Sequence, residues 1–232
     1  MQRVLSILAI IVLVCLTSAQ TMAQHRPNAC IGDTTHNLNE QVVVFAKVFV
    51  PKPPFGRDQF YNSWARGEIL FENGTKAQGV LLSYNSFHDD LFWLRDTDMK
   101  VGVVPKESIT GFKLHEQEQS PKAHFRKVYV PGFFSRHVLL EVLSEGEYTL
   151  YCNRRVTYQI DRQEFVRDNI YYLHRDGKYY RFKPNFFSFI LSFPKEHRAK
   201  VRRILWSNQL RVSQESDLSR AIEILNQQLQ GS

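Results

Sequence analysis

The sequence predicts an α+β protein that is mainly β, with an antiparallel β-sandwich or barrel-like meander and a small C-terminal segment of two or three helices. Three observations indicate this class. Short runs rich in β-branched and aromatic residues recur, with turn residues about every 8–12 positions. Asn73-Gly74 and Asp176-Gly177 are dipeptides that favour tight β-hairpins. Beyond Phe182 the apolar spacing changes from the period of a strand to that of a helix.

The N-terminus predicts a cleaved secretory signal peptide over residues 1–23. Arg3 gives a positive start, residues 4–16 are almost entirely apolar, and small residues allow cleavage after Ala19 or Ala23. The apolar run is too short for a comfortable membrane span. We therefore expect an exported chain that is periplasmic, outer-membrane-associated or secreted, with no transmembrane span after processing.

The rest of the chain divides by composition into an arm, two β units and a helical tail. Residues 24–41 are polar and predict a flexible arm, and the polar stretch 115–123 predicts a connection between the two β units. The first unit, residues 42–114, is expected to have strands at 42–50, 67–71, 79–84, 91–95, 101–104 and 109–114. The second, residues 124–183, is expected to have strands at 125–130, 138–143, 148–152, 170–174 and 179–182.

Residues 184–232 predict helices that pack on the β body. A short apolar segment at 186–193 ends at Pro194, and a basic amphipathic helix follows over 195–208. The last helix begins near Ser213 or Ser216. Its apolar stripe consists of Leu218, Ala221, Ile222, Leu225 and Leu229.

Two cysteines remain after removal of the signal peptide, Cys30 and Cys152. In an oxidising compartment they could form one disulfide between the arm and the second β unit. Closing so long a loop would stabilise the fold by about 3–5 kcal/mol. The alternative is a buried thiol at Cys152 and a free thiol at Cys30.

The formal net charge of +7 at pH 7 favours anionic partners, and the signal peptide accounts for only one of these charges. The basic helix concentrates this charge at Lys195, Arg198, Lys200, Arg202 and Arg203. Such a helix can dock on lipid head groups or an acidic glycan, whereas an ordinary surface helix whose long side chains cover apolar area is the favoured interpretation. Nucleic acid is not expected as the partner of an exported protein.

The aromatic hairpin carries Tyr171, Tyr172, Tyr179 and Tyr180, which could form a platform for stacking. Because neighbouring residues of a strand face opposite sides, half of these rings are expected in the core. Catalytic candidates are weaker. The chain lacks the common hydrolase, metalloprotease and nucleotide-binding motifs, so we expect no catalytic residue, cofactor or metal.

Two acidic clusters are candidates for a catalytic or metal site. His88, Asp89 and Asp90 are consecutive, so at most two of these side chains can point into one ligand shell of an extended chain. Asp161, Glu164 and Asp168 lie in a polar stretch with arginines and predict a surface loop or a short helix. The favoured interpretation is a solvated turn for the first cluster and a solvated crossover for the second.

The C-terminal third, YYLHRDGKYYRFKP followed by an apolar turn, a basic helix and a Leu-striped helix, resembles uncharacterised exported β-rich proteins of Bacteroidota-type Gram-negative bacteria. The resemblance implies compartment and architecture, and it brings no activity. The leading hypothesis is a non-enzymatic envelope protein that binds an anionic or protein partner. The alternatives are an envelope polysaccharide- or peptide-processing enzyme that uses surface carboxylates, and a ligand-binding β-barrel.

Overall fold

The computed structural model describes residues 61–95, 99–117, 120–130 and 136–230, together with the short segments 34–35, 43–44 and 48–49. The strands are β1 (Thr34–Thr35), β2 (Val43–Val44), β3 (Val48–Phe49), β4 (Ala65–Phe71), β5 (Lys76–Asn85), β6 (Asp90–Arg95), β7 (Lys100–Val104), β8 (Ile109–Gln117), β9 (Ser120–Val130), β10 (Arg136–Ser144), β11 (Thr149–Asn153), β12 (Val156–Gln159), β13 (Glu164–Arg167), β14 (Ile170–Arg175) and β15 (Lys178–Phe182). The helices are η2 (Lys106–Ser108), α2 (Phe186–Leu191), α3 (Lys195–Ser207) and α4 (Glu215–Gln230).

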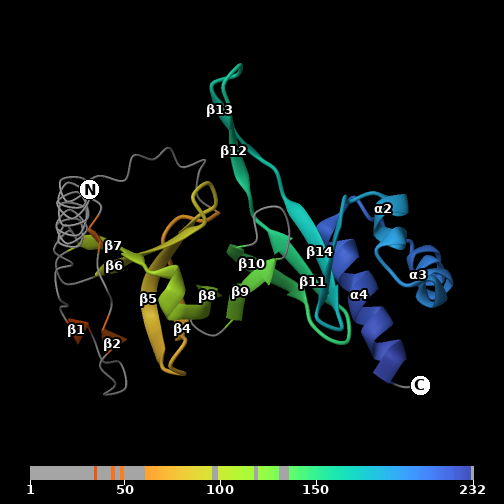
Figure 1. The fold of residues 1–232 in the computed structure, drawn as a ribbon, viewed down its shortest axis with the longest axis horizontal. Helices are drawn as coiled ribbons and strands as arrows, with labels where there is room; N and C mark the ends of the chain where they lie inside the picture. The colour runs from red at the N-terminus through yellow and green to blue at the C-terminus, as the bar shows by residue number, and fades with distance from the viewer. Residues whose placement is uncertain are drawn as a thin grey trace, which may run out of the picture.

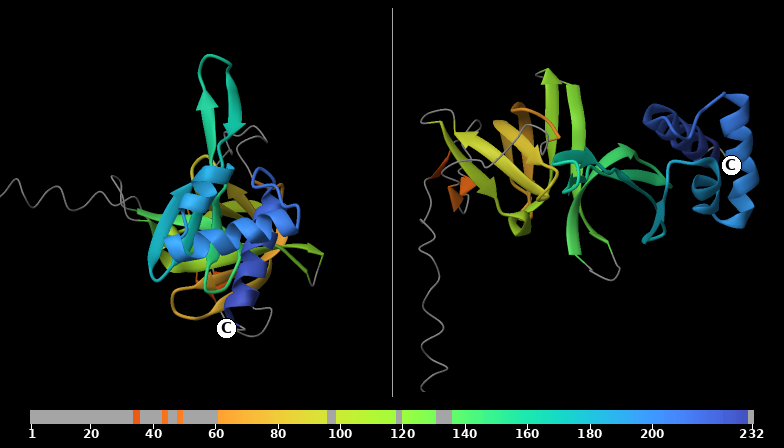
Figure 2. Two further views of the ribbon diagram at one scale, coloured as in Figure 1. Left: turned by 90° about the vertical axis from the view of Figure 1, so that its right-hand side faces the viewer. Right: turned by 90° about the horizontal axis from the view of Figure 1, so that it is seen from above.

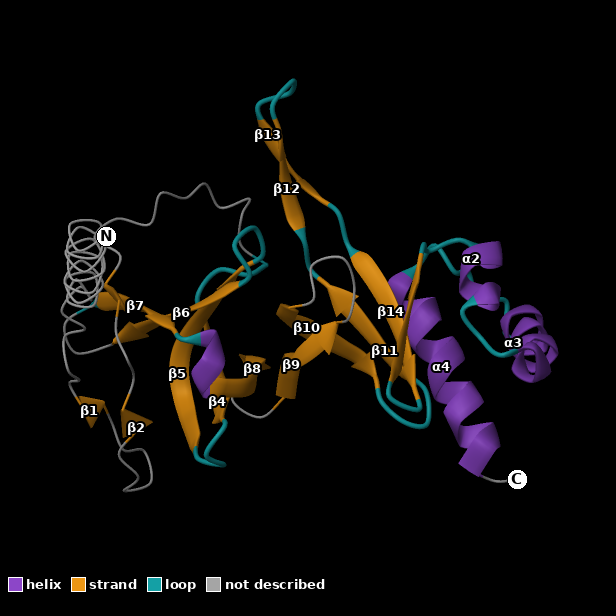
Figure 3. Ribbon diagram, in the orientation of Figure 1, coloured by secondary structure: helices purple, strands orange, loops and turns teal. Residues whose placement is uncertain are grey.

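The predicted class is confirmed: a mainly β chain ends in three helices (Figures 1 and 3). Among the described residues, eleven strands form one antiparallel sheet in the order β15-β14-β11-β10-β9-β8-β4-β5-β6-β7-β3. The sheet is open, because its edge strands β15 and β3 do not pair with each other. The barrel-like meander of the prediction is therefore not closed.

One row of buried side chains crosses eight strands of this sheet. Strand register places these residues directly opposite one another, in the order Ala77, Ile69, Phe112, Phe125, Glu141, Cys152, Tyr171 and Phe182. Each is less than a tenth exposed. Because directly paired residues of a ladder share a face, the two predicted β units present one continuous inner face.

Two apolar cores lie on this inner face. The first packs Tyr84 and Phe112 of the first β unit against Phe125 of the second, and the second core packs strands β11, β14 and β15 against the three helices. Glu141 is the charged member of the row and lies between the two cores. Glu141 therefore places a carboxyl group near the centre of the row.

Residues 115–123, expected as a connection, instead contribute to the paired ends of β8 and β9. His115 pairs with Pro121 and Gln117 with Ser120, with register shifts on both sides. Irregular pairing of this kind accommodates the proline, which cannot donate to the ladder. The two predicted β units are thus joined through a hairpin that belongs to the sheet.

The stretch expected as a polar crossover around Asp161 is a second difference. Strands β12 and β13 form a separate two-stranded sheet, which we call the hairpin arm. Figure 1 shows the hairpin arm projecting from the body of the molecule. The alternation of Val156 and Tyr158 with Thr157 and Gln159 was the sequence signal for this strand.

The helices occupy one end of the elongated molecule, opposite the first β unit (Figure 2). Helix α4 lies against β10 and β11, α3 packs on α4, and α2 packs on α3. The predicted stripe of α4 faces inward, with Leu218, Ala221, Ile222 and Leu225 buried. The predicted signal peptide and most of the predicted arm lie outside the described residues.

Candidate functional site

Helix α3 places its apolar and basic residues on different sides. Val201, Ile204 and Leu205 are buried in the second core, as their helical spacing predicts. Arg202 and Arg203 lie on the opposite side and are exposed. Lys195, in the first turn, is also exposed. Glu196 adds one exposed carboxylate to the same turn.

Two of the five predicted cations are hydrogen-bonded to the ends of other helices. The Arg198 guanidinium donates to the carbonyl oxygens of Phe193 at 2.8 Å and Leu191 at 3.2 Å, just after and at the end of α2. Lys200 donates to the carbonyl oxygen of Gln228, near the end of α4, at 3.1 Å. The last carbonyls of a helix lack partners within the helix, and cations stabilise them. Arg198 and Lys200 therefore hold the three helices together.

Large apolar side chains lie exposed beside the remaining cations. Phe187 is 78 % exposed, Leu191 63 % and Trp206 76 %. Phe187 and Leu191 are one turn apart on α2, and Trp206 follows Arg202 by one turn on α3. We call Phe187, Leu191, Lys195, Arg202, Arg203 and Trp206 the cationic–apolar end.

Hydrogen bonds connect the two halves of the cationic–apolar end. Arg198 bonds to the Leu191 carbonyl oxygen, and Arg202 Nε donates to the Arg198 carbonyl oxygen at 3.3 Å. These bonds join the end of α2 to α3, the two helices that carry the members of the cationic–apolar end. The sequence predicted the cations of α3. It did not predict that Phe187 and Leu191 are exposed, because the apolar composition of 186–193 is also that of a buried segment.

The local sequence explains why α2 exposes these residues. Asn185 caps the helix, with its side-chain oxygen accepting from the Ser188 N–H at 2.9 Å. Phe189 and Ile190 then face the core, so Phe187 and Leu191 face outward. A six-residue helix with five apolar residues cannot bury them all on one side.

The predicted aromatic platform is divided between the two faces of the sheet. Tyr171 is buried on the face that carries the helices. Tyr180 lies on the same face, because it pairs directly with Leu173, a member of the second core. Tyr172 and Tyr179 lie on the other face, where they pack with Tyr151. The structure does not bring the four tyrosines together into one stacking surface.

A buried ionic network occupies the boundary between the two cores. The Arg154 guanidinium donates from Nε to Glu141 and from its two terminal nitrogens to both carboxylate oxygens of Glu215, at 2.7 and 2.6 Å. The Tyr61 hydroxyl donates to Glu141 at 3.2 Å, and the Tyr171 hydroxyl donates to Glu215 at 3.0 Å. The network joins the segment before β4, strands β10 and β14, and the first turn of α4.

The two glutamates of this network have opposite pKa shifts. Burial raises the pKa of Glu141, although Arg154 and Tyr61 oppose the change. Burial would also raise the pKa of Glu215, but hydrogen bonds and charge from Arg154 outweigh it and lower that pKa. Burial and the nearby Glu141 carboxylate raise the pKa of Tyr61 to about 12. Each of these polar side chains has a hydrogen-bond partner within the network, as expected of groups that stabilise the fold.

In the predicted His88-Asp89-Asp90 cluster, Asp89 has a structural role. Asp89 accepts hydrogen bonds from the Tyr84 hydroxyl at 2.7 Å, the Leu139 N–H at 3.3 Å and Lys106 Nζ at 2.6 Å. It has a positive φ of 60°, which an aspartate tolerates better than most residues. Asp89 therefore ties the β5–β6 turn to β10 and η2.

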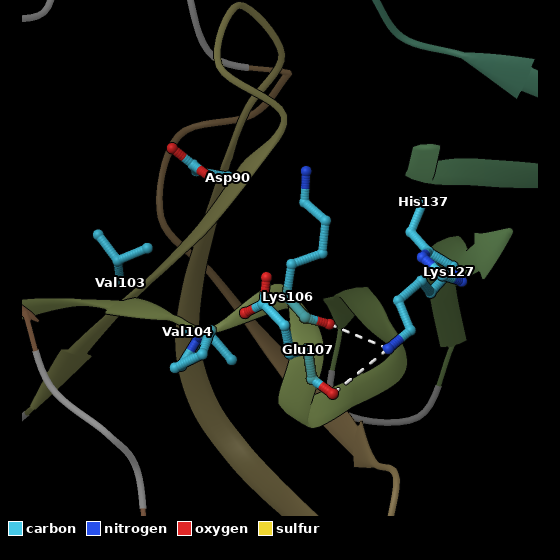
Figure 4. A pocket seen from close by; sticks show the side chains of 8 residues that line it. Asp90, Val103, Val104, Lys106, Glu107, Lys127 and His137 are labelled. Atoms are coloured by element: carbon cyan, nitrogen blue, oxygen red, sulfur yellow. Dashed lines mark hydrogen bonds between the residues drawn. The ribbon is translucent and has the colours of Figure 1, made fainter. Parts of the chain in front are cut away.

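Asp90 lines a hollow of about 610 Å³ between β6–β7, η2 and the β9–β10 hairpin (Figure 4). Burial raises its pKa, although Lys106 opposes the change. Lys127 points back toward η2, donating to the carbonyl oxygens of Lys106 at 3.1 Å and Glu107 at 3.4 Å. The lysines of this hollow are thus bonded to the protein itself.

A second hollow, of about 520 Å³, lies between the β5–β6 turn and the base of the hairpin arm, with Phe87, Asp89, Arg155 and Tyr158 in its lining. The carboxylates of the predicted crossover, Asp161, Glu164 and Asp168, are exposed on or beside the hairpin arm. Within the described ranges, no group of three or more histidine, cysteine and acidic side chains could hold a metal ion.

Cys152 is a free thiol in the described part of the chain, and the predicted bond to Cys30 is not made there. The side chain is fully buried in the second core, where burial raises the pKa of the thiol. Cys30 itself lies outside the described residues. The buried-thiol alternative explains Cys152, since strand register places it inside the row between Glu141 and Tyr171.

None of the described helices combines the length and the apolar character that crossing a membrane requires. Comparison with protein-family models, with curated proteins and with solved structures gives no match.

Proposed function

We propose that this protein is a non-enzymatic, exported binding module of the cell envelope that docks an anionic partner through its cationic–apolar end. The observation that carries the proposal is the separation of roles among the helix cations. Arg198 and Lys200 bond to carbonyl oxygens at the ends of α2 and α4, whereas Lys195, Arg202 and Arg203 are exposed at the outer surface and are not bonded in this way.

Electrostatics supports an anionic partner. Exposed cations near an anionic surface contribute about 1 kcal/mol each, and the attraction falls off within a Debye length of about 8 Å at physiological salt. The excess of basic residues in the whole chain, 30 against 23 acidic, adds attraction at longer range. Glu196 subtracts one charge from the surface without balancing the three cations.

The enzymatic alternative has weaker support. Asp89 is bonded to Lys106, and Asp90 lines a different hollow from Asp89. Asp161 and Asp168 are exposed on or beside the hairpin arm. Neither hollow has two of these carboxylates in its lining, whereas glycoside chemistry requires a pair that faces across one cleft. The barrel alternative would need a closed sheet, and this sheet is open.

The test is salt-dependent retention on immobilised dextran sulfate, a simple polyanion. The variant Arg202→Glu/Arg203→Glu should elute at clearly lower salt than the wild type, because it reverses two exposed charges of the docking surface. The matched control is Arg162→Glu/Arg167→Glu, which makes the same change of net charge at exposed positions of the hairpin arm.

Equal elution of the two variants would mean that only net charge matters, and it would remove the cationic–apolar end from the proposal. Far-UV circular dichroism of both variants checks that the fold is intact, since all four arginines are exposed.

A further inference from the structure

The exposed apolar side chains of the cationic–apolar end identify the kind of anionic partner. We infer that this end inserts into the head-group region of a membrane leaflet that contains anionic lipid. The inference rests on the proposed function and adds to it the physical nature of the partner.

Exposure is the first argument. Phe187, Leu191 and Trp206 are each more than three-fifths exposed. Trp206 lies on α3 with the exposed cations, and Phe187 and Leu191 lie on α2, which packs on α3. Single exposed apolar residues are common, but a group beside cations at one end of a molecule marks an interaction surface. A hydrated acidic glycan would pair with the arginines and leave these three side chains in water.

The arrangement of the helices is the second argument. The apolar residues of α3 that face the core (Val201, Ile204 and Leu205) leave Arg202, Arg203 and Trp206 on the outer side. The Arg198 hydrogen bonds to the carbonyl oxygens of Leu191 and Phe193 hold the end of α2 against α3, so the backbone at this point is already ordered before binding. A preorganised surface loses less conformational entropy when it binds.

The chemistry of a leaflet matches this surface at two depths. Lipid phosphates at the head-group level attract Lys195, Arg202 and Arg203, whose long stems let the charges stay in the polar layer. Phe187 and Leu191 can enter the acyl boundary. Tryptophan prefers the interface between the two, where its ring is apolar and its N–H can bond to polar groups.

The shape of the molecule is compatible with this contact. Figures 1 and 2 show the helices at one end of an elongated molecule, with the first β unit at the other end. A leaflet could therefore meet the cationic–apolar end without touching the sheet or the hairpin arm. The body would then project away from the membrane surface.

The test is co-sedimentation with vesicles, using the chain without its predicted signal peptide so that the apolar run at 4–16 cannot contribute. Vesicles of phosphatidylcholine with a third of phosphatidylglycerol are compared with vesicles of phosphatidylcholine alone. We expect partitioning only onto the anionic vesicles. It should weaken at least tenfold in Arg202→Glu/Arg203→Glu and at least tenfold in Phe187→Ser/Leu191→Ser, which keeps every cation.

The matched control for the apolar variant is Met99→Ser/Ile160→Ser, which removes two side chains that are 68 % and 82 % exposed elsewhere on the molecule. This control should bind like the wild type. Brominated lipid in the anionic vesicles should quench the fluorescence of Trp206, and Trp206→Phe should abolish that quenching while the signals of Trp64 and Trp93 remain.

The outcomes separate the two claims. Retention on dextran sulfate that depends on Arg202 and Arg203, without binding to anionic vesicles, supports the proposed function and overturns the membrane inference. Vesicle binding that is unchanged in Phe187→Ser/Leu191→Ser also overturns it, because the contact would then be purely electrostatic. Loss of both kinds of binding in the wild type would overturn both claims.

Discussion

At the scale of single residues, burial decides which charges belong to the structure. Arg154 and Arg155 are neighbours in sequence, yet their side chains are 11 % and 49 % exposed. Arg154 bonds to Glu141 and Glu215 in the interior, whereas Arg155 approaches Asp168 at the surface with an N···O distance of 3.8 Å. A buried ion pair costs much desolvation when it forms, but breaking it leaves an uncompensated charge.

Replacing Arg154 with methionine should therefore lower the free energy of unfolding by about 3–5 kcal/mol, because Glu141 would remain buried without its cation. Arg155→Met is the matched control and should change it by no more than about 0.5 kcal/mol, as expected for a surface site. Urea denaturation followed by circular dichroism measures both. The double variant Arg154→Met/Glu141→Leu should recover part of the loss, and two variants of equal stability would show that the network contributes nothing.

At the scale of elements, one side chain attaches α4 to the sheet. Asn226 is buried, accepts from the Tyr148 N–H at 2.9 Å and donates to the Tyr148 carbonyl oxygen at 2.8 Å. The Asn226 amide thus makes the pair of backbone hydrogen bonds that a neighbouring strand would make at Tyr148, just before β11. Gly146 makes this approach possible, since a Cβ at that position would collide with the Asn226 amide. The helix is held to the sheet by matched backbone and side-chain groups as well as by apolar packing.

Gly146→Ala should accordingly destabilise the protein by about 1–3 kcal/mol, the usual cost of overpacking. A double-mutant cycle with Asn226→Ala identifies the cause. In the Asn226→Ala background the added methyl group has more space, so the cost of Gly146→Ala should shrink markedly. An unchanged cost in that background would place the strain somewhere other than the Asn226 amide.

At the scale of the whole molecule, the continuous row from Ala77 to Phe182 makes the two β units one body. The hairpin arm is different. It is a separate two-stranded sheet. Its contacts with the body include the Phe87–Phe165 ring pair and the hydrogen bond from the Val156 N–H to the Ser86 carbonyl oxygen. An isolated two-stranded ribbon contributes little stability of its own.

Replacing residues 158–165 with Asn-Gly should shorten the hairpin arm to a tight turn between Thr157 and Val166, which are paired. We expect the free energy of unfolding to change by no more than about 1 kcal/mol and vesicle binding to be retained. Phe112→Ala, in the middle of the row, serves as the contrasting variant and should cost about 3–5 kcal/mol. Thermal and urea unfolding compare the two, and a large loss in the shortened variant would make the arm part of the core.

The local elements were predictable because their signals are local. The Asn-Gly turn after β4, the Asp-Gly turn before β15 and the 3.6-residue stripe of α4 each depend on a few neighbouring residues. The same holds for the cations of α3. The hairpin arm was missed because four-residue strands with charged turns resemble a solvated loop, although the alternation around Tyr158 was present.

The sequence by itself determined a β-rich chain with a helical tail, a basic helix and two half-buried tyrosine pairs, because periodicity fixes which side each residue faces. Only the tertiary structure decided that Glu141 lies between two cores, that Arg198 and Lys200 bond to the ends of α2 and α4, and that α2, with Phe187 and Leu191 exposed, packs on α3. Those relations depend on strand register and helix packing, which join residues far apart in the chain.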